Sequence, residues 1–260
     1  IINNHSVSSF RHTPSKDTTK AMNDIQWLPR LECISEQVDS ETAGLADIGY
    51  DHAYLLERLA ERATIERLIG VEIQADAHTR VHARLPSELS QRLELRHGDG
   101  LSPLKPHEVD TVVFAGIGEI KILQMLDAEP MVAESLRRLI VCPANFKGVL
   151  RLGLAQRGWK CVAENIAKER GHYYPTLVMK RGEARLTHPL DYFGPLLAQH
   201  SPRHLETFLE HLKVRFQAAL GAGRGPSTGD AFRDDVRRSF IQTIQQIEPA
   251  LSELRGRPSP

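Results

Sequence analysis

The sequence of 260 residues contains no apolar run close to the roughly 18 residues that a membrane-spanning helix needs. It has only three cysteines, Cys33, Cys142 and Cys161, and their spacing matches no metal-binding motif. His78 and His82 stand four residues apart, but no Glu follows the first of them as in the zinc motif H-E-x-x-H. We therefore expect a cytoplasmic protein with reduced, buried thiols, no bound metal and no contact with a membrane.

The glycine pattern of dinucleotide-binding domains is missing as well. That pattern, G-x-G-x-x-G, follows the first strand of such domains, whereas only Gly49 stands at this place here. The contents of 41% hydrophobic and 25% charged residues are ordinary for a globular protein. The length allows one sizeable α/β domain with an appendage, and the glycine pattern disfavours an NAD-dependent enzyme.

The net charge of zero hides an uneven distribution. Residues 1–135 carry 13 Lys and Arg against 22 Asp and Glu, whereas residues 136–260 carry 20 against 11. A basic C-terminal half is consistent with binding to a polyanion such as RNA. Solvated helix faces would produce the same surplus, and the charge alone leaves both interpretations open.

Apolar runs that predict strands alternate with helical patterns along most of the chain. An amphipathic helix is predicted at 25–38, followed by strands at 43–48, 68–73, 93–96, 109–115 and 136–141, with helices between them at 53–62, 76–85, 119–126 and, after the last strand, 146–157. Such alternation predicts a parallel sheet covered on both faces. Two further strands, 159–167 and 173–181, are joined by only five residues and must therefore pair antiparallel. An antiparallel hairpin that closes a parallel sheet is typical of the class I methyltransferase fold, a Rossmann-like architecture.

This pattern divides the chain into three parts. Residues 1–24 are polar without a hydrophobic period, which predicts a disordered leader. The methyltransferase-like domain is expected at 25–185. Apolar stripes from Leu205 to Phe216 and from Phe232 to Leu251, separated by the glycine-rich segment 221–229, predict a helical, coiled-coil-like hairpin within 186–255.

The stretch from Leu45 to Leu55 has the strongest functional signal. A strand ends in a glycine turn and a helix begins shortly afterwards, an arrangement that presents backbone N–H groups to a bound ligand. Asp47 and Asp51 lie in this turn, and their carboxylates favour a ligand with positive charge or hydroxyl groups over a phosphate. We therefore expect S-adenosylmethionine, whose ammonium and sulfonium groups are cationic, rather than a dinucleotide.

Two more acidic residues follow the next two strands. Glu72 ends the second strand, where a carboxylate can accept hydrogen bonds from both ribose hydroxyls of a nucleoside. Asp99, on a Gly-Asp-Gly turn after the third strand, can accept one from an adenine amino group. Each has a plainer alternative: a surface carboxylate for Glu72, a turn former for Asp99, a helix N-cap for Asp51 and a packing residue for His52.

Taken in chain order, four motifs of this sequence resemble the bacterial tRNA (adenine(22)-N(1))-methyltransferase family. They are Asp47-Ile-Gly-Tyr-Asp-His-Ala-Tyr-Leu55, Glu72, Arg96-His-Gly-Asp-Gly-Leu101 and Ala115-Gly-Ile-Gly118. The resemblance runs from about residue 31 to residue 251. It implies a methyltransferase that uses S-adenosylmethionine and acts on adenine N1 of tRNA. The residues implied to hold the cofactor are Asp47, Gly49, Glu72, Asp99 and Gly100. We expect Tyr50, His52, Ile73, Ala115 and Gly116 to contact it as well. Asp51 is implied to face the target base as the catalytic residue, and Tyr54, Asn145, Lys147 and Arg151 are expected to contact the RNA.

The chain departs from the family pattern at three places on the substrate side. Tyr50 replaces a small residue, Glu119 ends the Gly-Ile-Gly-Glu string where the family has Gly, and Cys142-Pro-Ala144 replaces Gln-Pro-Asn, with Asn145 one position late. These departures leave two alternatives open. One is a protein of this fold that binds the cofactor or RNA without catalysis, and the other is a methyltransferase for a different nucleobase or a small molecule.

Overall fold

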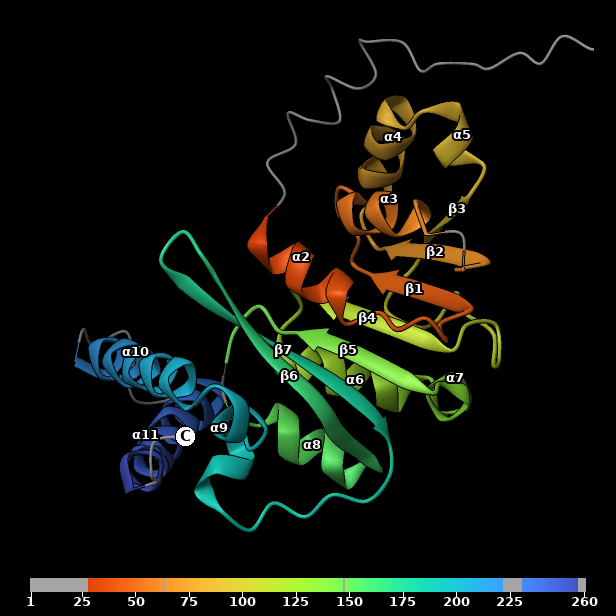
Figure 1. The fold of residues 1–260 in the computed structure, drawn as a ribbon. Coiled ribbons are helices and arrows are strands. Elements are labelled where there is room, and N and C mark those ends of the chain that lie inside the picture. Colours follow the sequence, from red (N-terminus) through yellow and green to blue (C-terminus); the bar gives the residue numbers. More distant parts are fainter. Residues whose placement is uncertain (1–27, 63, 147, 222–230, 257–260) are drawn as a thin grey trace, which may run out of the picture.

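The computed structural model describes residues 28–62, 64–146, 148–221 and 231–256, with the backbone alone for 231–240. The predicted leader at 1–24 and Lys147 lie outside these residues. The described chain forms one seven-stranded sheet with helices on both faces and a helical part at one side (Figure 1).

The sheet has the strand order β3-β2-β1-β4-β5-β7-β6. Its strands are β1 (Gly44–Ile48), β2 (Arg67–Glu72), β3 (Leu93–His97), β4 (Thr111–Ala115), β5 (Arg138–Cys142), β6 (Trp159–Glu169) and β7 (His172–Arg181). The first five pair in parallel, whereas β7 pairs antiparallel with both β5 and β6. The order reverses between β1 and β4, and in open α/β sheets ligands bind outside the carboxyl ends of the strands at such a point.

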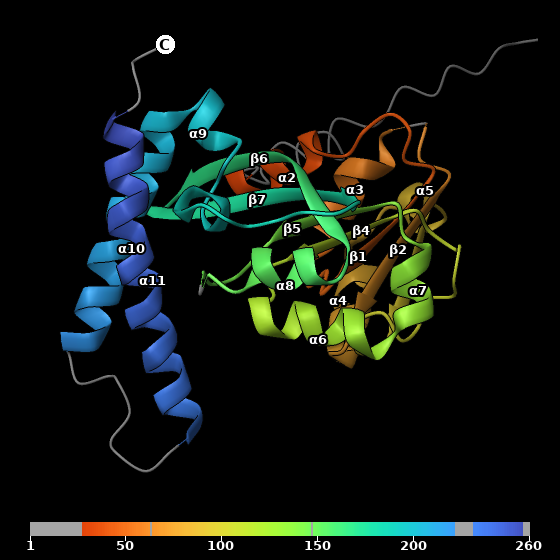
Figure 2. The same ribbon diagram turned by 90° about the horizontal axis from the view of Figure 1, so that it is seen from below.

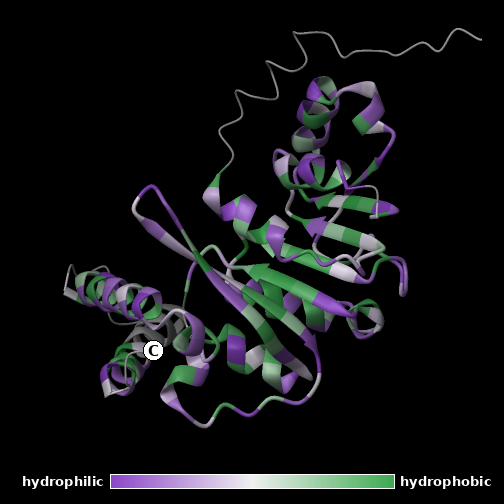
Figure 3. Cartoon of the chain, in the orientation of Figure 1, coloured by the Kyte–Doolittle hydropathy of each residue, from purple (hydrophilic) through white to green (hydrophobic). Residues whose placement is uncertain are grey.

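Separate apolar clusters cover the two faces of the sheet. Helices α2 (Pro29–Glu36), α3 (Tyr54–Ala60) and α4 (Ala75–Arg84) pack on one face through residues such as Ile34, Leu56 and Val81. Helices α6 (Glu119–Ala128), α7 (Pro130–Ser135) and α8 (Leu150–Gln156) pack on the other through residues such as Ile122 and Leu154. The central strands between them are mainly hydrophobic (Figure 3). A parallel sheet buried on both faces requires this composition.

The helical part has an apolar core of its own. It contains the short turn η1 (Pro189–Tyr192), α9 (Leu197–His200) and the long helices α10 (Pro202–Gly221) and α11 (Ala231–Gly256), which pack side by side (Figure 2). Leu205, Phe208 and Leu212 of α10 are buried against Ile247 and Leu251 of α11. Phe146, Ile166 and Tyr173 of the sheet part join the same cluster and so connect the helices to the sheet.

The predicted fold class is confirmed, with shifts at the boundaries of its elements. The helix predicted at 146–157 begins only at Leu150, and the strand predicted from residue 109 begins at Thr111. The hairpin strands are longer than expected, so that Arg170 and Gly171 alone form their turn. The short elements α5 (Ser87–Ser90), α7, α9 and η1 were not predicted, because four to six residues are too few for a helical period to show. None of the described helices combines the length and the apolar character that crossing a bilayer requires.

Candidate functional site at the carboxyl ends of β1 to β4

The turn after β1 is shaped by three residues with left-handed backbone conformation. Gly49 has φ +76°, Asp51 +45° and Ala53 +58°. The N–H of Gly49 donates to the carbonyl of Val71 at 2.7 Å, which fixes the turn to the end of β2. Helix α3 then begins at Tyr54, with Ala53 and not Asp51 at its N-cap. The alternative role of Asp51 as a helix cap is therefore wrong.

Asp51 instead presents its carboxylate to solvent at the mouth of the site. Its side chain is 65% exposed, with one oxygen 3.5 Å from Arg80 of α4 and the other 3.6 Å from His52. Such exposed ion pairs are weak and readily exchanged. The Asp51 carboxylate can therefore turn to another cationic group that enters the site.

Asp47 lies at the inner end of the same turn and is only 4% exposed. Burial and, to a smaller extent, the neighbouring Glu72 raise its pKa to about 7, while Arg30 acts in the opposite direction. A buried carboxylate beside a second one strongly favours a cation as its partner.

Glu72 is held in one orientation at the end of β2. Its Oε1 accepts hydrogen bonds from the backbone N–H groups of Ile73 (2.8 Å) and Gln74 (3.0 Å), and its Oε2 lies 3.4 Å from the N–H of Asp51. The side chain is 8% exposed, whereas the neighbouring Ile73 is 57% exposed. A carboxylate that is fixed by backbone donors, with lone pairs still open, suits a ribose diol.

Asp99 and Gly100 form the turn after β3. The Asp99 carboxylate is half exposed and pairs with Lys121 of α6 at 3.0 Å. Gly100 has φ +61°, and an added Cβ would lie 2.7 Å from Cγ of Met125, so only glycine fits here. The His97 ring nitrogen Nε2 lies 3.0 Å from the carbonyl oxygen of Ile73, which connects the β3 and β2 ends.

The tyrosines of the motif have different surroundings. Tyr50 is buried, and its hydroxyl is hydrogen-bonded to Nδ1 of His78 at 3.1 Å, while burial raises the pKa of the phenol to about 12. The ring of Tyr54 lies between His52, 5.4 Å away, and the guanidinium of Arg84 at 4.8 Å. Tyr50 is thus a packing residue under the turn, and Tyr54 lies on the α3–α4 side of it.

The segments after β4 and β5 are bound to each other and form the remaining wall. The N–H of Gly116 donates to the carbonyl of Cys142, and that of Ala144 to the carbonyl of Ile117, both at 2.9 Å. The Asn145 side chain lies against Gly118, since a Cβ added there would be 3.5 Å from its Nδ2. Asn145 is therefore placed at the wall although it stands one position late in the sequence.

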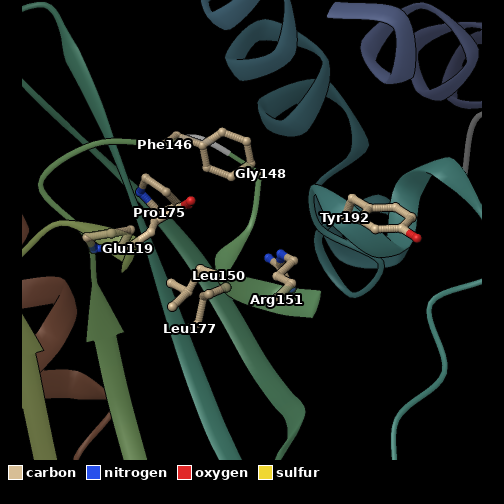
Figure 4. Close-up of a pocket in the computed structure, with 9 residues that line it drawn as sticks. Glu119, Phe146, Gly148, Leu150, Arg151, Pro175, Leu177 and Tyr192 are labelled. Carbon is tan, nitrogen blue, oxygen red and sulfur yellow. The ribbon is translucent and has the colours of Figure 1, made fainter. Parts of the chain in front are cut away.

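Glu119, the most conspicuous departure from the family pattern, does not project into the site. It is 1% exposed at the start of α6, and its Oε2 accepts a hydrogen bond from the N–H of Val149 at 3.1 Å. Glu119 also borders a small cavity next to Phe146, Leu150 and Tyr192 (Figure 4). It therefore holds the segment between β5 and α8 in place.

Arg151, expected to contact RNA, is instead buried in the protein. Its guanidinium donates to Oε1 of Glu164 at 2.7 Å and to the carbonyl of Phe193 at 3.2 Å. The N–H of Leu197 donates to the other oxygen of Glu164 at 3.2 Å. We therefore assign Arg151 to the attachment of the helical part and not to a substrate. The expected role of Lys147 falls outside the described residues.

Arg30 of α2 is a site residue that sequence reasoning missed. Its guanidinium lies 5.2 Å from the centroid of the Tyr174 ring, and a Cβ added to Gly116 would be 3.8 Å from its Nη1. It also acts electrostatically on Asp47. Its Nε is buried without a hydrogen-bond partner in the described structure. No pattern in the sequence marks a single Arg in the first helix, because its approach to the site is purely tertiary.

Asp47, Glu72 and Asp99 therefore stand at the carboxyl ends of three adjacent strands, and Arg30 and Asn145 lie near the ends of β4 and β5. We call this edge of the sheet the crevice. Among the described residues, no three His, Cys, Asp or Glu side chains are grouped so that they could hold a metal ion. The carboxylates of Asp47 and Glu72 at this edge suit a ligand with cationic and hydroxyl groups. A model of the methyltransferase domain family matches residues 28–177. The chain belongs to this methyltransferase family.

Similar proteins include curated relatives and solved structures that cover most of this chain. The tRNA (adenine(22)-N(1))-methyltransferase of Bacillus subtilis is 29% identical over 163 residues, which cover 62% of this chain and 68% of the relative. A crystal structure of a Streptococcus pneumoniae protein, provisionally assigned as a tRNA (m1A22) methyltransferase, is 28% identical with a TM-score of 0.70 and covers 85% of this chain and 98% of that one. The same protein in complex with S-adenosyl-L-methionine gives 26% identity over 85% and 98% of the two chains, with a TM-score of 0.71.

Proposed function

We propose that this methyltransferase transfers a methyl group from S-adenosylmethionine to N1 of an adenine in tRNA. The observation that carries the proposal is that Asp47, Glu72 and Asp99 stand at the ends of three adjacent parallel strands, at the same edge of the sheet. The named activity of the Bacillus subtilis relative and the cofactor bound to the Streptococcus pneumoniae protein support the choice of reaction and cofactor. A tRNA substrate also implies a cytoplasmic enzyme.

The crevice fits the zwitterionic amino-acid end of this cofactor. Buried Asp47, whose pKa is raised to about 7, would gain a cationic partner in the ammonium group. Arg30, whose Nε is buried without a partner among the described residues, would gain an anionic one in the carboxylate. Opposite charges on neighbouring side chains thus match opposite charges on one ligand.

The nucleoside end fits the two outer strand ends. Glu72, fixed by the N–H groups of Ile73 and Gln74, would accept from the ribose hydroxyls, and Asp99 from the adenine amino group. When bound, the cofactor supplies an electrophilic methyl group on a sulfonium. Gly49 and Gly116, both with left-handed backbone, leave room between the two ends because neither has a side chain.

The remaining residues would act on the adenine. N1 of neutral adenine has a free lone pair, so no protein base is needed before transfer, and catalysis rests on alignment. The ring gains a positive charge as N1 is methylated, and the exposed carboxylate of Asp51 can stabilise that charge. Asn145 lies on the opposite wall, where its amide can contact the edge of a base that has been turned out of its stack.

Incubation of the protein with methyl-labelled cofactor and unmodified bulk tRNA tests the proposal. We expect label in tRNA, recovered as 1-methyladenosine after digestion to nucleosides. Asp51→Ala should reduce the rate by at least about tenfold, while the cofactor affinity stays within twofold of wild type. Label in another nucleoside, or in small molecules only, would replace the proposed substrate. Cofactor binding without transfer to any RNA would refute the enzymatic role.

A further inference from the structure

Basic side chains gather where the tip of the β6–β7 hairpin meets α10. Lys168, Arg170 and His172 are exposed at the tip, and Arg215 is exposed on α10, one helical turn after His211. In Figure 1 the tip projects to the left of α2 and above α10, and it is hydrophilic in Figure 3. We call these five residues the tip cluster.

Ring contacts fix the two elements of the tip cluster to each other. The Tyr173 ring lies 5.1 Å from the His211 ring and 6.2 Å from that of Phe208, both on α10. The ammonium group of Lys168, the residue opposite Tyr173 in the hairpin, lies 5.4 Å from the centroid of the same ring. The tip cluster is therefore a surface held by packing rather than a set of scattered cations.

The positive charge of the tip cluster is not neutralised within the described structure. No ion pair joins its Lys or Arg side chains to a carboxylate of the described residues. Glu169, the only carboxylate at the tip, turns to α2, where its Oε2 lies 3.4 Å from the N–H of Arg30. Burial lowers the pKa of His211, and Arg215, His172 and Lys168 lower it further, as expected where cations crowd together without a counter-charge.

The tip cluster lies next to the proposed catalytic crevice. Tyr174, which follows Tyr173, points to the other face of the strand, and its ring lies under Arg30 at the crevice wall. A nucleic acid whose base enters the crevice would therefore bring its backbone over the tip. Because a polynucleotide has one negative charge per phosphate, it matches a surface whose Lys and Arg side chains form no ion pair with a carboxylate of the described residues.

We propose that the tip cluster binds the phosphate backbone of the RNA substrate and so holds the target nucleotide at the crevice. The proposal rests on the proposed function, because it takes RNA as the substrate. It assigns the contacts to the hairpin tip and to α10, which the methyltransferase-domain family model, ending at residue 177, covers only in part.

Arg170 permits a test in which loss of folding cannot imitate loss of binding. Arg170 and Gly171 both have left-handed backbone, with φ +48° and +80°, in a two-residue turn between the paired Glu169 and His172. Asn is preferred over Arg at the first of these positions, because it tolerates positive φ. Arg170→Asn should therefore leave the turn as stable as before or more stable, while it removes one cation.

The experiment measures binding of unmodified bulk tRNA at several salt concentrations for wild type, Arg170→Asn, Lys168→Gln and the double variant. Each lost phosphate contact should lower the magnitude of the slope of log K against log salt by about 0.7 to 0.9. We therefore expect the slope of the double variant to fall by roughly 1.5, with at least tenfold weaker binding at low salt. Lys160→Gln, an exposed lysine at the opposite end of β6, is the matched control and should bind as wild type does.

Failure of this inference and failure of the proposed function give different results. Unchanged tRNA affinity and salt slope in the double variant would overturn the inference, as would an equal loss in Lys160→Gln. Equal cofactor affinity in all variants, together with the reduced slope, would support it. Absence of methyl transfer by the wild-type protein would contradict the proposed function, and the binding measurement does not depend on transfer.

Discussion

Asp47 and Arg30 place opposite charges at the inner end of the crevice. The role of each depends on the other, so neither role can be recognised from one residue alone. The glycine turn and its acidic residues could be recognised in the sequence, because strand, glycine and helix start are adjacent in the chain. Arg30 could not, because α2 reaches Asp47, Gly116 and Tyr174 only through packing. Arg151 was misplaced for the same reason: its partner Glu164 is on another element.

The raised pKa of Asp47 predicts how the stability of the free protein depends on pH. Its folded-state pKa is about 7, against an ordinary value of 3.8, so the folded state holds a proton that the unfolded state releases between these values. The contribution of Asp47 to stability is therefore complete below about pH 4 and is lost as the pH rises to about 7, at on the order of 1 kcal/mol per pH unit.

Asp47→Asn should remove this dependence. In thermal unfolding between pH 4 and 9, the stability of the variant relative to wild type should increase as the pH rises to about 7 and should not increase further above it. With S-adenosylmethionine added, the wild-type stability should no longer fall with pH more steeply than that of the variant, since the ammonium group of the cofactor offsets the buried charge of Asp47. A constant difference across the whole range would show that Asp47 is ionised throughout.

At the scale of elements, the segment between β5 and α8 determines the substrate wall. The sequence predicted a helix from residue 146, but the chain stays irregular up to Val149, whose N–H donates to Glu119. The apolar residues of this segment fit a helical period, and only the contact with α6 explains why the helix begins later. Glu119 therefore supports this segment from α6 through its contact with Val149.

Replacement of Glu119 should separate support of this wall from cofactor binding. Glu119→Ala leaves the partly buried N–H of Val149 without its acceptor, at a cost of roughly 1 kcal/mol. Steady-state methyl transfer should show a kcat lowered by about tenfold, with unchanged cofactor affinity.

Glu119→Gln keeps an oxygen that can accept the bond and should recover most of the rate. Equal rates in both variants and the wild type would mean that the 143–149 segment does not position the substrate.

At the scale of the molecule, the helical part is attached to the sheet by a buried ion pair. Arg151 and Glu164 bridge α8 and β6, and through Phe193 and Leu197 they hold the chain that leads into α10. Burial alone would lower the pKa of Arg151, but Glu164 raises it and keeps the guanidinium charged. We propose that the part expected at 186–255 therefore acts with the sheet as one rigid body.

Removal of one partner tests this attachment. Glu164→Gln leaves the Arg151 charge buried without a counter-charge and should lower the free energy of unfolding by about 3–5 kcal/mol in denaturant titrations. The double change Arg151→Met with Glu164→Leu removes both charges and should cost much less. Equal losses in the single and double variants would show that packing, and not the ion pair, makes the attachment.

The parallel sheet and the antiparallel hairpin were predictable because they follow from the alternation of apolar runs and from one short connection. Their consequence is that the carboxyl ends of β1, β2 and β3 lie side by side, which is the central claim of this account. Calorimetric titration of S-adenosylmethionine into the wild type, Glu72→Gln and Asp99→Asn tests it most directly, with exposed Glu88→Gln as control. One equivalent should bind to the wild type and the control, with affinity at least about tenfold lower in Glu72→Gln and several-fold lower in Asp99→Asn. Equal affinity in all four proteins, or no binding to the wild type, would contradict it.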